Sequence, residues 1–187
     1  MAVTVRFAAL EDAEKLLDIY TYYVEDTAIT FEYDVPSLEE FTERMRSIMA
    51  FYPYLVAEED GKILGYAYAS KFHPRAAYAW SAEATVYLDK NARGKGLGRQ
   101  LYTDLEEYLK QMGILNLNAC IASTDEEDAY LTNGSEKFHR ALGYQLVGKF
   151  HHSGYKFNRW YDMIWMEKML GEHTENVQTV KSIHEVK

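Results

Sequence analysis

The stretch Arg93-Gly94-Lys95-Gly96-Leu97-Gly98 joins an alternating segment, residues 79–88, to a segment whose apolar residues recur at helical spacing. Its glycines leave no side chain to block a ligand, so several backbone N–H groups can turn toward one anion at the positive end of the expected helix. Lys90 and Arg99 add positive charge and no acid lies between them, although the whole chain has a formal net charge of -9. The sequence therefore predicts a local binding site for a phosphate-bearing ligand.

The spacing within the loop distinguishes the kinds of phosphate site. The loop lacks the Gly-Lys-Ser/Thr of a Walker motif, and Arg99 stands where the dinucleotide motif G-x-G-x-x-G requires its third glycine. Arg93, Gly96 and Gly98 instead form R-x-x-G-x-G, which resembles the pyrophosphate loop of the GCN5-related N-acetyltransferases. That resemblance implies that acetyl-CoA binds between a central strand and the helix after it. Taken alone, the loop leaves a tight turn without a ligand as the alternative.

The composition is that of a globular protein. The 187 residues fit one domain, the hydrophobic content is 48%, and no apolar run is long enough to span a bilayer, so we expect no membrane partner. Acids outnumber bases by 29 to 20, which argues against a nucleic-acid partner. No secretory leader is recognisable in the first residues, and we therefore expect a cytoplasmic protein.

The cysteine and histidine content gives no sign of a metal site. Cys120 is the single cysteine, so an intramolecular disulfide is excluded, and its apolar neighbours predict a small buried side chain. The six histidines lack H-E-x-x-H or a similar ligand spacing. We expect no structural or catalytic metal.

Alternation of apolar and polar residues predicts seven strands, and helical spacing predicts four helices. The expected strands cover residues 3–8, 54–59, 62–72, 79–88, 114–122, 145–152 and 160–169. The expected helices cover residues 11–26, a segment that begins at Ser37, the segment after the glycine loop, and 135–142. This order predicts a single α/β domain over residues 1–170, with a mixed sheet that is antiparallel in its first half. The polar tail, residues 171–187, is expected to be a flexible extension.

Local signals support three of these boundaries. Ser37 and Glu40 form the S-x-x-E capping box of the second helix. Asp60-Gly61 is a strong signal for a two-residue hairpin between two strands. Gly143 is placed to end the last helix.

The strand at residues 79–88 carries polar side chains on one face. These are Ser81, Glu83, Thr85 and Tyr87. An acid on a central strand needs a partner, a raised pKa or an open pocket, so Glu83 is the leading candidate for a catalytic group. It could take the proton of an amine that attacks a thioester, since about nine-tenths of a free α-amine is protonated at neutral pH. A structural ion pair is the alternative.

Several motifs in fixed order resemble the phosphinothricin acetyltransferase branch of the family. They are Arg75-Ala76-Ala77-Tyr78, Glu83-Ala84-Thr85-Val86-Tyr87-Leu88, the glycine loop with Leu101-Tyr102, His139-Arg140-Ala141-Leu142-Gly143-Tyr144, and Trp160-Tyr161-Asp162. The resemblance implies the acetyltransferase (GNAT) fold, acetyl-CoA as co-substrate, a homodimer, and Glu83 as general base. The implied CoA contacts are the strand residues Val86, Tyr87 and Leu88, the loop residues Arg93, Gly94, Lys95, Gly96, Leu97, Gly98 and Arg99, and Asn133.

The same resemblance places the acceptor near Arg75, Ala77, Tyr78 and Phe31. An arginine fork suits the carboxylate of an acceptor, although a solvated loop arginine is equally open for Arg75. Phe31 is expected either to wall the acceptor pocket or to pack in the core. His139 stands where the superfamily often has a tyrosine acid, so it either protonates the leaving thiolate or packs.

The sequence thus predicts an enzyme that transfers acetyl from acetyl-CoA to the α-amine of a small amino acid or analogue. Phosphinothricin, methionine sulfoximine and methionine sulfone are the expected kinds of acceptor. Direct attack in a ternary complex is expected, because Cys120 lies in an apolar strand and is a poor acyl carrier. The alternatives are acetylation of a protein N-terminus or a polyamine, which would need an acidic acceptor groove, and a non-catalytic acetyl-CoA sensor.

Overall fold

The first four strands of the computed structural model pair as the alternation of the sequence predicts. The structure describes residues 3–187. The strands β1 (Thr4–Phe7), β2 (Tyr54–Glu59), β3 (Lys62–Lys71) and β4 (Ser81–Leu88) lie in that order, each antiparallel to the next. The turn between β2 and β3 is Asp60-Gly61, with φ of 52° and 76°, the left-handed pair that a two-residue hairpin requires. The predicted hairpin is confirmed.

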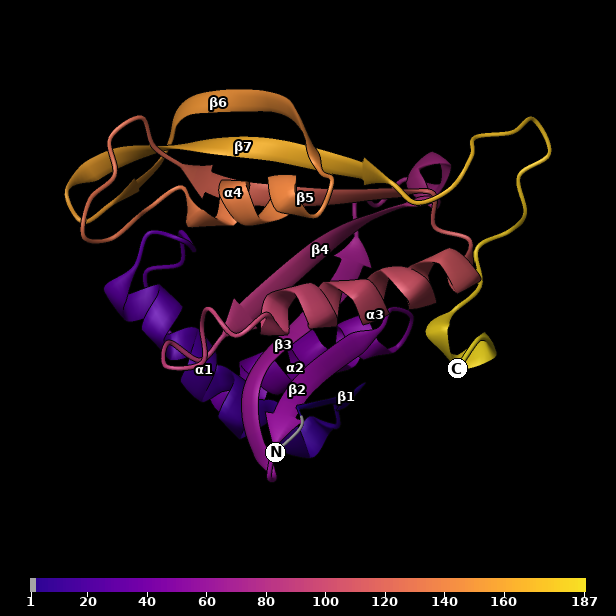
Figure 1. The fold of residues 1–187 in the computed structure, drawn as a ribbon, viewed down its shortest axis with the longest axis horizontal. Helices are drawn as coiled ribbons and strands as arrows, with labels where there is room; N and C mark the ends of the chain where they lie inside the picture. The colour runs from indigo at the N-terminus through magenta and orange to yellow at the C-terminus, as the bar shows by residue number, and fades with distance from the viewer. Residues whose placement is uncertain (1–2) are drawn as a thin grey trace. The chain divides into compact units, whose positions relative to one another are not determined.

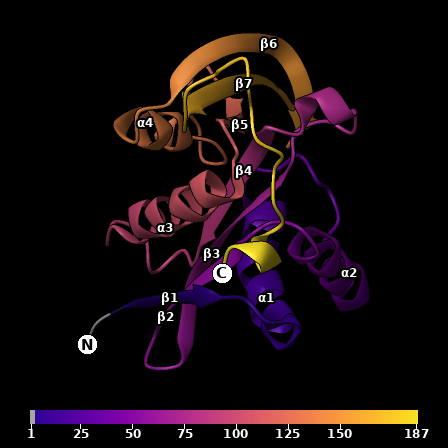
Figure 2. The same cartoon turned by 90° about the vertical axis from the view of Figure 1, so that its right-hand side faces the viewer.

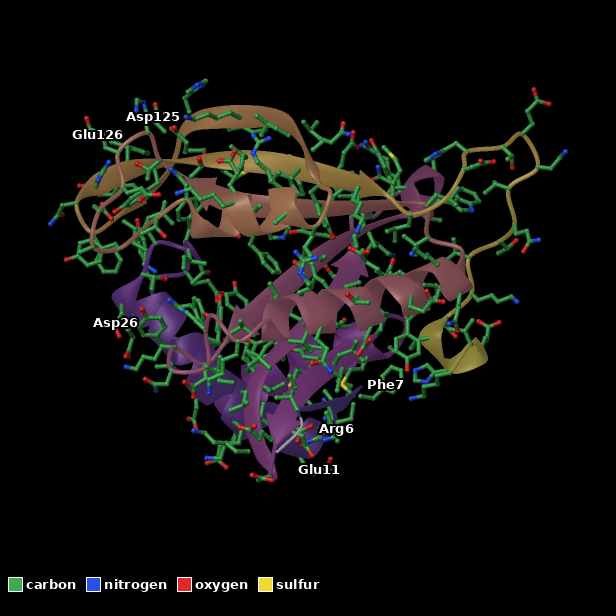
Figure 3. The ribbon with its side chains drawn as sticks, in the orientation of Figure 1. Arg6, Phe7, Glu11, Asp26, Asp125 and Glu126 are labelled. Carbon is green, nitrogen blue, oxygen red and sulfur yellow. The ribbon has the colours of Figure 1, made fainter. Side chains whose placement is uncertain are left out.

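An arginine ties β1 to its surroundings. The Arg6 guanidinium donates to both carboxylate oxygens of Asp12, at 2.8 and 3.0 Å, and its Nε donates to Glu58 at 2.8 Å. Figure 3 labels Arg6 and its neighbour Phe7 on this strand. The hydrogen bonds from Arg6 are the main reason that the pKa of Asp12 is lowered. Asp12 ends a short 3-10 turn, Leu10–Asp12, which leads into α1 (Ala13–Asp26), so the expected first helix is confirmed.

Helices α2 (Leu38–Met49) and α3 (Leu97–Met112) both contact β2 and β3. Ser37 caps α2, since its Oγ accepts the backbone N–H of Glu40 at 3.1 Å. The Glu40 carboxylate instead accepts a hydrogen bond from Arg44, so only half of the expected capping box forms. The buried side of α3 includes the leucines expected from the spacing, and the helix runs in front of β3 in Figure 1.

The described chain divides into two units. The first comprises residues 3–19, 36–117 and 169–187, and the second comprises residues 20–35 and 118–168. The second unit contains α4 (Gly134–Ala141), β6 (Gln145–Lys156) and most of β5 (Asn116–Ser123) and β7 (Arg159–Met169). Its strands follow the order β5-β7-β6, with β6 antiparallel to β7.

Within residues 3–187 the structure has seven strands in a mixed, mostly antiparallel sheet and four α-helices. The order of these elements along the chain is the one expected from the sequence. The predicted α/β fold class is therefore confirmed. In this part of the chain no helix combines the length and the apolar character needed to cross a membrane.

The C-terminal segment, residues 171–187, packs on the first unit instead of forming the expected flexible extension. It reaches the C-terminal end of α3 (Figures 1 and 2), where the Lys181 N–H donates to the carbonyl of Met112 at 2.9 Å. The Trp80 indole N–H donates to the carbonyl of Gln178 at 2.8 Å. Ile183 is only 2% exposed. The segment has no periodicity because a single apolar anchor and backbone hydrogen bonds hold it.

Cys120 is exposed, and the expectation of a buried cysteine was wrong. Its apolar neighbours Ala119 and Ile121 belong to the opposite face of β5, because successive side chains of a strand alternate. Apolar neighbours in sequence are therefore no guide to the burial of Cys120.

Candidate active site

Glu83 lies in the middle of a polar face that extends from β4 onto β3. The antiparallel register sets Glu83 opposite Ser70, Thr85 opposite Tyr68, and Tyr87 opposite Tyr66. The Glu83 side chain is half-buried, and no donor within residues 3–187 hydrogen-bonds to its carboxylate. Burial raises the pKa of the Glu83 carboxyl, because desolvation disfavours the charged form. This is the environment in which a carboxylate can act as a base.

Tyrosine rings provide much of the low-polarity surroundings on this face. Tyr54 stacks on Tyr68 with ring centroids 4.7 Å apart, and on Tyr66 at 5.8 Å. Tyr102 of α3 is fully buried, and its pKa is raised first by burial and then by the charges of nearby groups that include Glu83. Tyr102 belongs to the Leu101-Tyr102 motif, which by itself predicts no role for this residue. Its burial and its electrostatic interaction with Glu83 place it beside the candidate base.

The glycine loop after β4 has the backbone geometry of an open cradle. Gly94 and Gly96 both have φ of 78°, and Gly96 occupies the N-cap position of α3. No atom lies within 4 Å of where a Cβ would stand on either glycine. The first turn of α3 contains no acid, and the first N–H groups of a helix in general have no carbonyl acceptor within the helix itself. Lys95 is exposed in the same loop. An anion can therefore approach the backbone here without steric hindrance.

The loop before β4 presents an arginine to solvent. Arg75 precedes a short 3-10 turn, Ala76–Tyr78, and is exposed, as are Ala77 and Tyr78. Within residues 3–187 no acid forms an ion pair with the Arg75 guanidinium. The Tyr78 ring lies 4.9 Å from the His73 ring and 5.9 Å from the Phe72 ring. Arg75 is thus available to an outside carboxylate.

The predicted site residues are distributed over both units. The first unit contains the candidate base, the loop before β4, the end of β4 and the whole glycine loop. Glu83 and the glycine loop lie on consecutive parts of this unit, because β4 is followed along the chain by the loop. Phe31, Asn133 and His139 belong to the second unit.

His139 is buried in the second unit, with 3% of its surface exposed. Its Nδ1 lies 2.8 Å from the carbonyl oxygen of Ser135, and it must carry the proton of this hydrogen bond because a carbonyl only accepts. Burial is the main reason that the pKa of His139 is lowered. The ring also meets Phe138 and Tyr144 edge to face. These surroundings favour a neutral imidazole.

Asn133 and Phe31 are held by contacts within the second unit. The Asn133 side chain accepts the Thr124 N–H at 3.2 Å and donates to the Thr124 carbonyl at 2.8 Å, which joins the start of α4 to the end of β5. Phe31 is half-buried and packs against a small core of Ala28, Leu131 and Tyr161. Core packing, one of the two roles expected for Phe31, therefore applies to the buried part of its side chain.

Comparison with known proteins identifies the family. Residues 5–165 match the model of the acetyltransferase (GNAT) domain. The chain belongs to the GNAT acetyltransferase family. It is an acetyl-CoA-dependent N-acetyltransferase, as the sequence predicts.

Two relatives of this GNAT acetyltransferase have names from amino-acid acetylation. The phosphinothricin N-acetyltransferase of Streptomyces coelicolor is 35% identical over 172 residues, which cover 90% of this chain and 96% of that protein. The crystal structure of a phosphinothricin acetyltransferase from Sinorhizobium meliloti in complex with acetyl-CoA has a TM-score of 0.84 and 35% identity, covering 95% of this chain and 96% of that chain.

A third relative has a different named substrate. The crystal structure of a ribosomal-protein-alanine N-acetyltransferase from Brucella melitensis has a TM-score of 0.81 and 32% identity, covering 89% of this chain and 99% of that chain. Similarity alone therefore leaves the acceptor of this GNAT acetyltransferase open. The open glycine cradle and its basic side chains fit the diphosphate of acetyl-CoA.

Proposed function

We propose that this GNAT enzyme acetylates the α-amine of a small amino acid or analogue of the phosphinothricin, methionine sulfoximine or methionine sulfone kind. The observation that carries the proposal is the half-buried Glu83 carboxylate, with a raised pKa, on the strand that leads into the glycine cradle. Arg75 supports the choice of acceptor, because an exposed guanidinium without an ion pair in the described chain suits an α-carboxylate.

In the proposed reaction Glu83 accepts a proton from the acceptor amine as its nitrogen attacks the acetyl carbonyl carbon, directly or through a water molecule. Acetyl-CoA supplies the thioester, whose C–S bond breaks as the amide forms, and the electron pair leaves with the CoA thiolate. Both co-substrates are bound together, and no acyl group is carried on the protein. The exposed Cys120 takes no part in this scheme.

The proposed CoA contacts lie at the end of β4 and in the glycine loop that follows it. Backbone groups of Val86, Tyr87 and Leu88 on β4 pair with the pantetheine arm. Residues 93–99 hold the diphosphate through backbone N–H groups at the start of α3 and through basic side chains. Asn133 is proposed as a further contact in the second unit.

Of the two roles open for His139, we propose packing rather than acid catalysis. The proton on Nδ1 is engaged with the Ser135 carbonyl, and the lowered pKa keeps the ring neutral at pH 7. A neutral ring of this tautomer carries no proton on Nε2 to give to a thiolate. A CoA thiolate is a weak base, so the scheme does not depend on a dedicated acid.

The acceptor class is tested by CoA thiol release with matched acceptors. Phosphinothricin, methionine sulfoximine and methionine sulfone are compared with a peptide that begins with alanine and with spermidine, at fixed acetyl-CoA. The proposal expects kcat/KM for at least one of the amino-acid analogues to exceed both others by about tenfold or more. A preference for the alanine peptide would favour the rival reading as a protein N-terminal acetyltransferase, which the Brucella relative supports. Acetyl-CoA binding without turnover on any acceptor would favour a sensor.

We further propose a cytoplasmic homodimer. The exposed apolar side chains of Leu146, Val147 and Phe150, which lie within five residues of one another on β6, support the dimer, because exposed apolar side chains that gather in one place mark interaction surfaces. Sedimentation velocity tests the state of assembly. Wild type is expected at twice the monomer mass, and the Val147→Ser/Phe150→Ser variant at monomer mass. A monomeric wild type at micromolar concentration would contradict the dimer.

A further inference from the structure

Three successive residues of β6 hold the segment that carries Phe31. Gly154, Tyr155 and Lys156 all contact the chain between the end of α1 and residue 33. Both segments belong to the second unit, and the turn between β6 and β7 lies at one end of the hairpin in Figure 1. No sequence motif marks any of these three residues.

Gly154 admits the Phe31 ring against the backbone of β6. A Cβ at position 154 would stand 2.3 Å from Cε2 and 2.5 Å from Cζ of Phe31, which is far inside van der Waals contact. The position is buried within the β6–β7 pairing, where Gly154 lies opposite Tyr161. Any larger residue at 154 must displace the ring or the strand, because the ring is half-buried and packed on its other side.

Lys156 ties the backbone of the same segment. Its ammonium is buried and donates to the carbonyl of Val24, in the last turn of α1, at 2.7 Å, and to the carbonyl of Thr30 at 2.9 Å. A cation at this point also interacts favourably with the negative end of the helix. The hydroxyl of Tyr33 donates to the carbonyl of Tyr155. These bonds fix the chain immediately before and after Phe31.

The two segments are not packed solidly against each other. A cavity of about 520 Å³, lined in part by Val24, Tyr33 and Lys156, opens beside them. Open space therefore lies beside Val24 and Tyr33, on either side of the segment that carries Phe31. The contacts at 154–156 set the position of Phe31 together with the packing of its ring on Ala28, Leu131 and Tyr161.

We infer that Gly154 and Lys156 are positioning residues that set acceptor specificity by holding Phe31. This inference rests on the proposed function and takes from the family resemblance that Phe31 borders the acceptor. Neither residue needs to touch the acceptor. A change at either residue alters the KM and the selectivity for the acceptor and spares acetyl-CoA.

Gly154→Ala tests this inference, with Gly148→Ala as the matched control. Both glycines lie on β6, but no atom stands within 4 Å of a Cβ at position 148. Steady-state kinetics use whichever compound the wild-type enzyme acetylates best in the acceptor panel. Gly154→Ala is expected to raise the acceptor KM about tenfold or more and to change the acetyl-CoA KM less than twofold, whereas Gly148→Ala matches wild type. Equal acceptor KM values for the two variants, or equal increases in both KM values, would overturn the inference.

A double variant separates positioning from a general loss of folding. Leucine at position 31 lacks Cε2 and Cζ, the two ring atoms that come closest to a Cβ at position 154. Gly154→Ala/Phe31→Leu is therefore expected to recover the thermal stability of Phe31→Leu alone and to share its order of acceptor preference. A double variant less stable than the sum of the single losses would contradict the contact. A peptide as best acceptor would overturn the proposed function, while the KM comparison would still decide the inference.

Lys156→Met gives a second measurement, which needs no acceptor. The methionine keeps the apolar stem but leaves two carbonyls without their donor. Amide hydrogen exchange is expected to rise in residues 24–33 and to stay unchanged in α3. Unchanged exchange in residues 24–33 would overturn the role of Lys156.

Discussion

Glu83 is an acidic residue in a half-buried position, and burial opposes the negative charge of its carboxylate. Burial raises the pKa of the Glu83 carboxyl, because desolvation destabilises its ionised form relative to its protonated form. A structural ion pair would have lowered this pKa instead. The direction of the shift therefore argues against a structural ion pair at Glu83.

Glu83→Gln is expected to reduce turnover by about 10²- to 10⁴-fold while acetyl-CoA binding survives, because the amide cannot accept the proton. The wild-type kcat/KM should fall as pH drops through the raised pKa of Glu83, above the ordinary glutamate range. In the variant this acid limb should vanish, and the rate should follow the free-amine fraction up to about pH 9.

Unfolding measurements on the same variant provide the control. The variant should be at least as stable as wild type at pH 8, since it removes a carboxylate whose ionisation burial penalises. Near-normal turnover at pH 7, or reduced stability with normal turnover per folded molecule, would remove the assignment.

Arg75 is the residue on which the proposed class of acceptor depends. Arg75→Ala is expected to raise the KM for a free amino acid by about ten- to a hundredfold, the loss of one charge-assisted pair. The KM for the corresponding amino-acid amide should change little, because the amide lacks the carboxylate. Initial rates with each acid and amide pair make the measurement, and equal losses for both would refute the clamp.

At the scale of elements, the proposed diphosphate site between β4 and α3 depends on the backbone conformation of the loop. Gly96 has φ of 78° and Gly61, in the β2–β3 turn, has φ of 76°, and neither has an atom within 4 Å of a Cβ position. An L-residue costs about 1–2 kcal/mol at such a φ. The two glycines are thus matched in strain and in space, but only Gly96 lies in the proposed diphosphate site.

Gly96→Ala and Gly61→Ala are expected to lower stability by similar amounts, about 1–2 kcal/mol each. Only Gly96→Ala should weaken acetyl-CoA binding, by about tenfold or more, because its methyl group would occupy the space that the diphosphate enters. Calorimetric titration with acetyl-CoA and chemical denaturation measure the two effects. Equal affinities for acetyl-CoA in both variants would show that the cradle is only a turn.

At the scale of the whole molecule, the last residues of the chain complete the first unit. The segment after β7 places Ile183, 2% exposed, beside the carbonyl of Phe51, which accepts the Ile183 N–H at 2.9 Å. The His184 ring also lies 2.9 Å from the carbonyl of Met49. The tail thereby satisfies backbone groups at the end of α2 as well as of α3.

Ile183→Ala is expected to destabilise the protein by about 2–5 kcal/mol, the cost of truncating a buried isoleucine. Val177→Ala in the same segment is the control and should stay within about 0.5 kcal/mol, since Val177 is 41% exposed. Urea denaturation followed by tryptophan fluorescence measures both changes. Equally small losses in the free energy of unfolding for the two variants would show that Ile183 does not anchor the tail in solution.

Short-range rules determined much of this protein from its sequence. The alternation of residues 79–88 predicted β4 and the face that carries Glu83, and Asp60-Gly61 predicted the first hairpin turn, whose φ values are positive as expected. The position of the glycine loop between strand and helix indicated the phosphate cradle. These features depend on neighbours within a few residues of each other, which is the range that periodicity and turn chemistry describe.

Only the tertiary structure decided the second hairpin. The sequence suggested strands at 145–152 and 160–169, but β6 continues to Lys156 and turns in two residues, Phe157 and Asn158, with φ of 50° and 57°. A phenylalanine is unfavourable in this conformation, and its ring is held by stacking on Tyr130 with centroids 4.0 Å apart. Tyr130 is distant from Phe157 in sequence. The carbonyls that accept hydrogen bonds from Lys156, and the Phe31 ring that requires glycine at position 154, are likewise distant in sequence from β6. Periodicity and turn motifs cannot predict such partners, because these contacts stabilise the protein only after distant segments have come together in the folded chain.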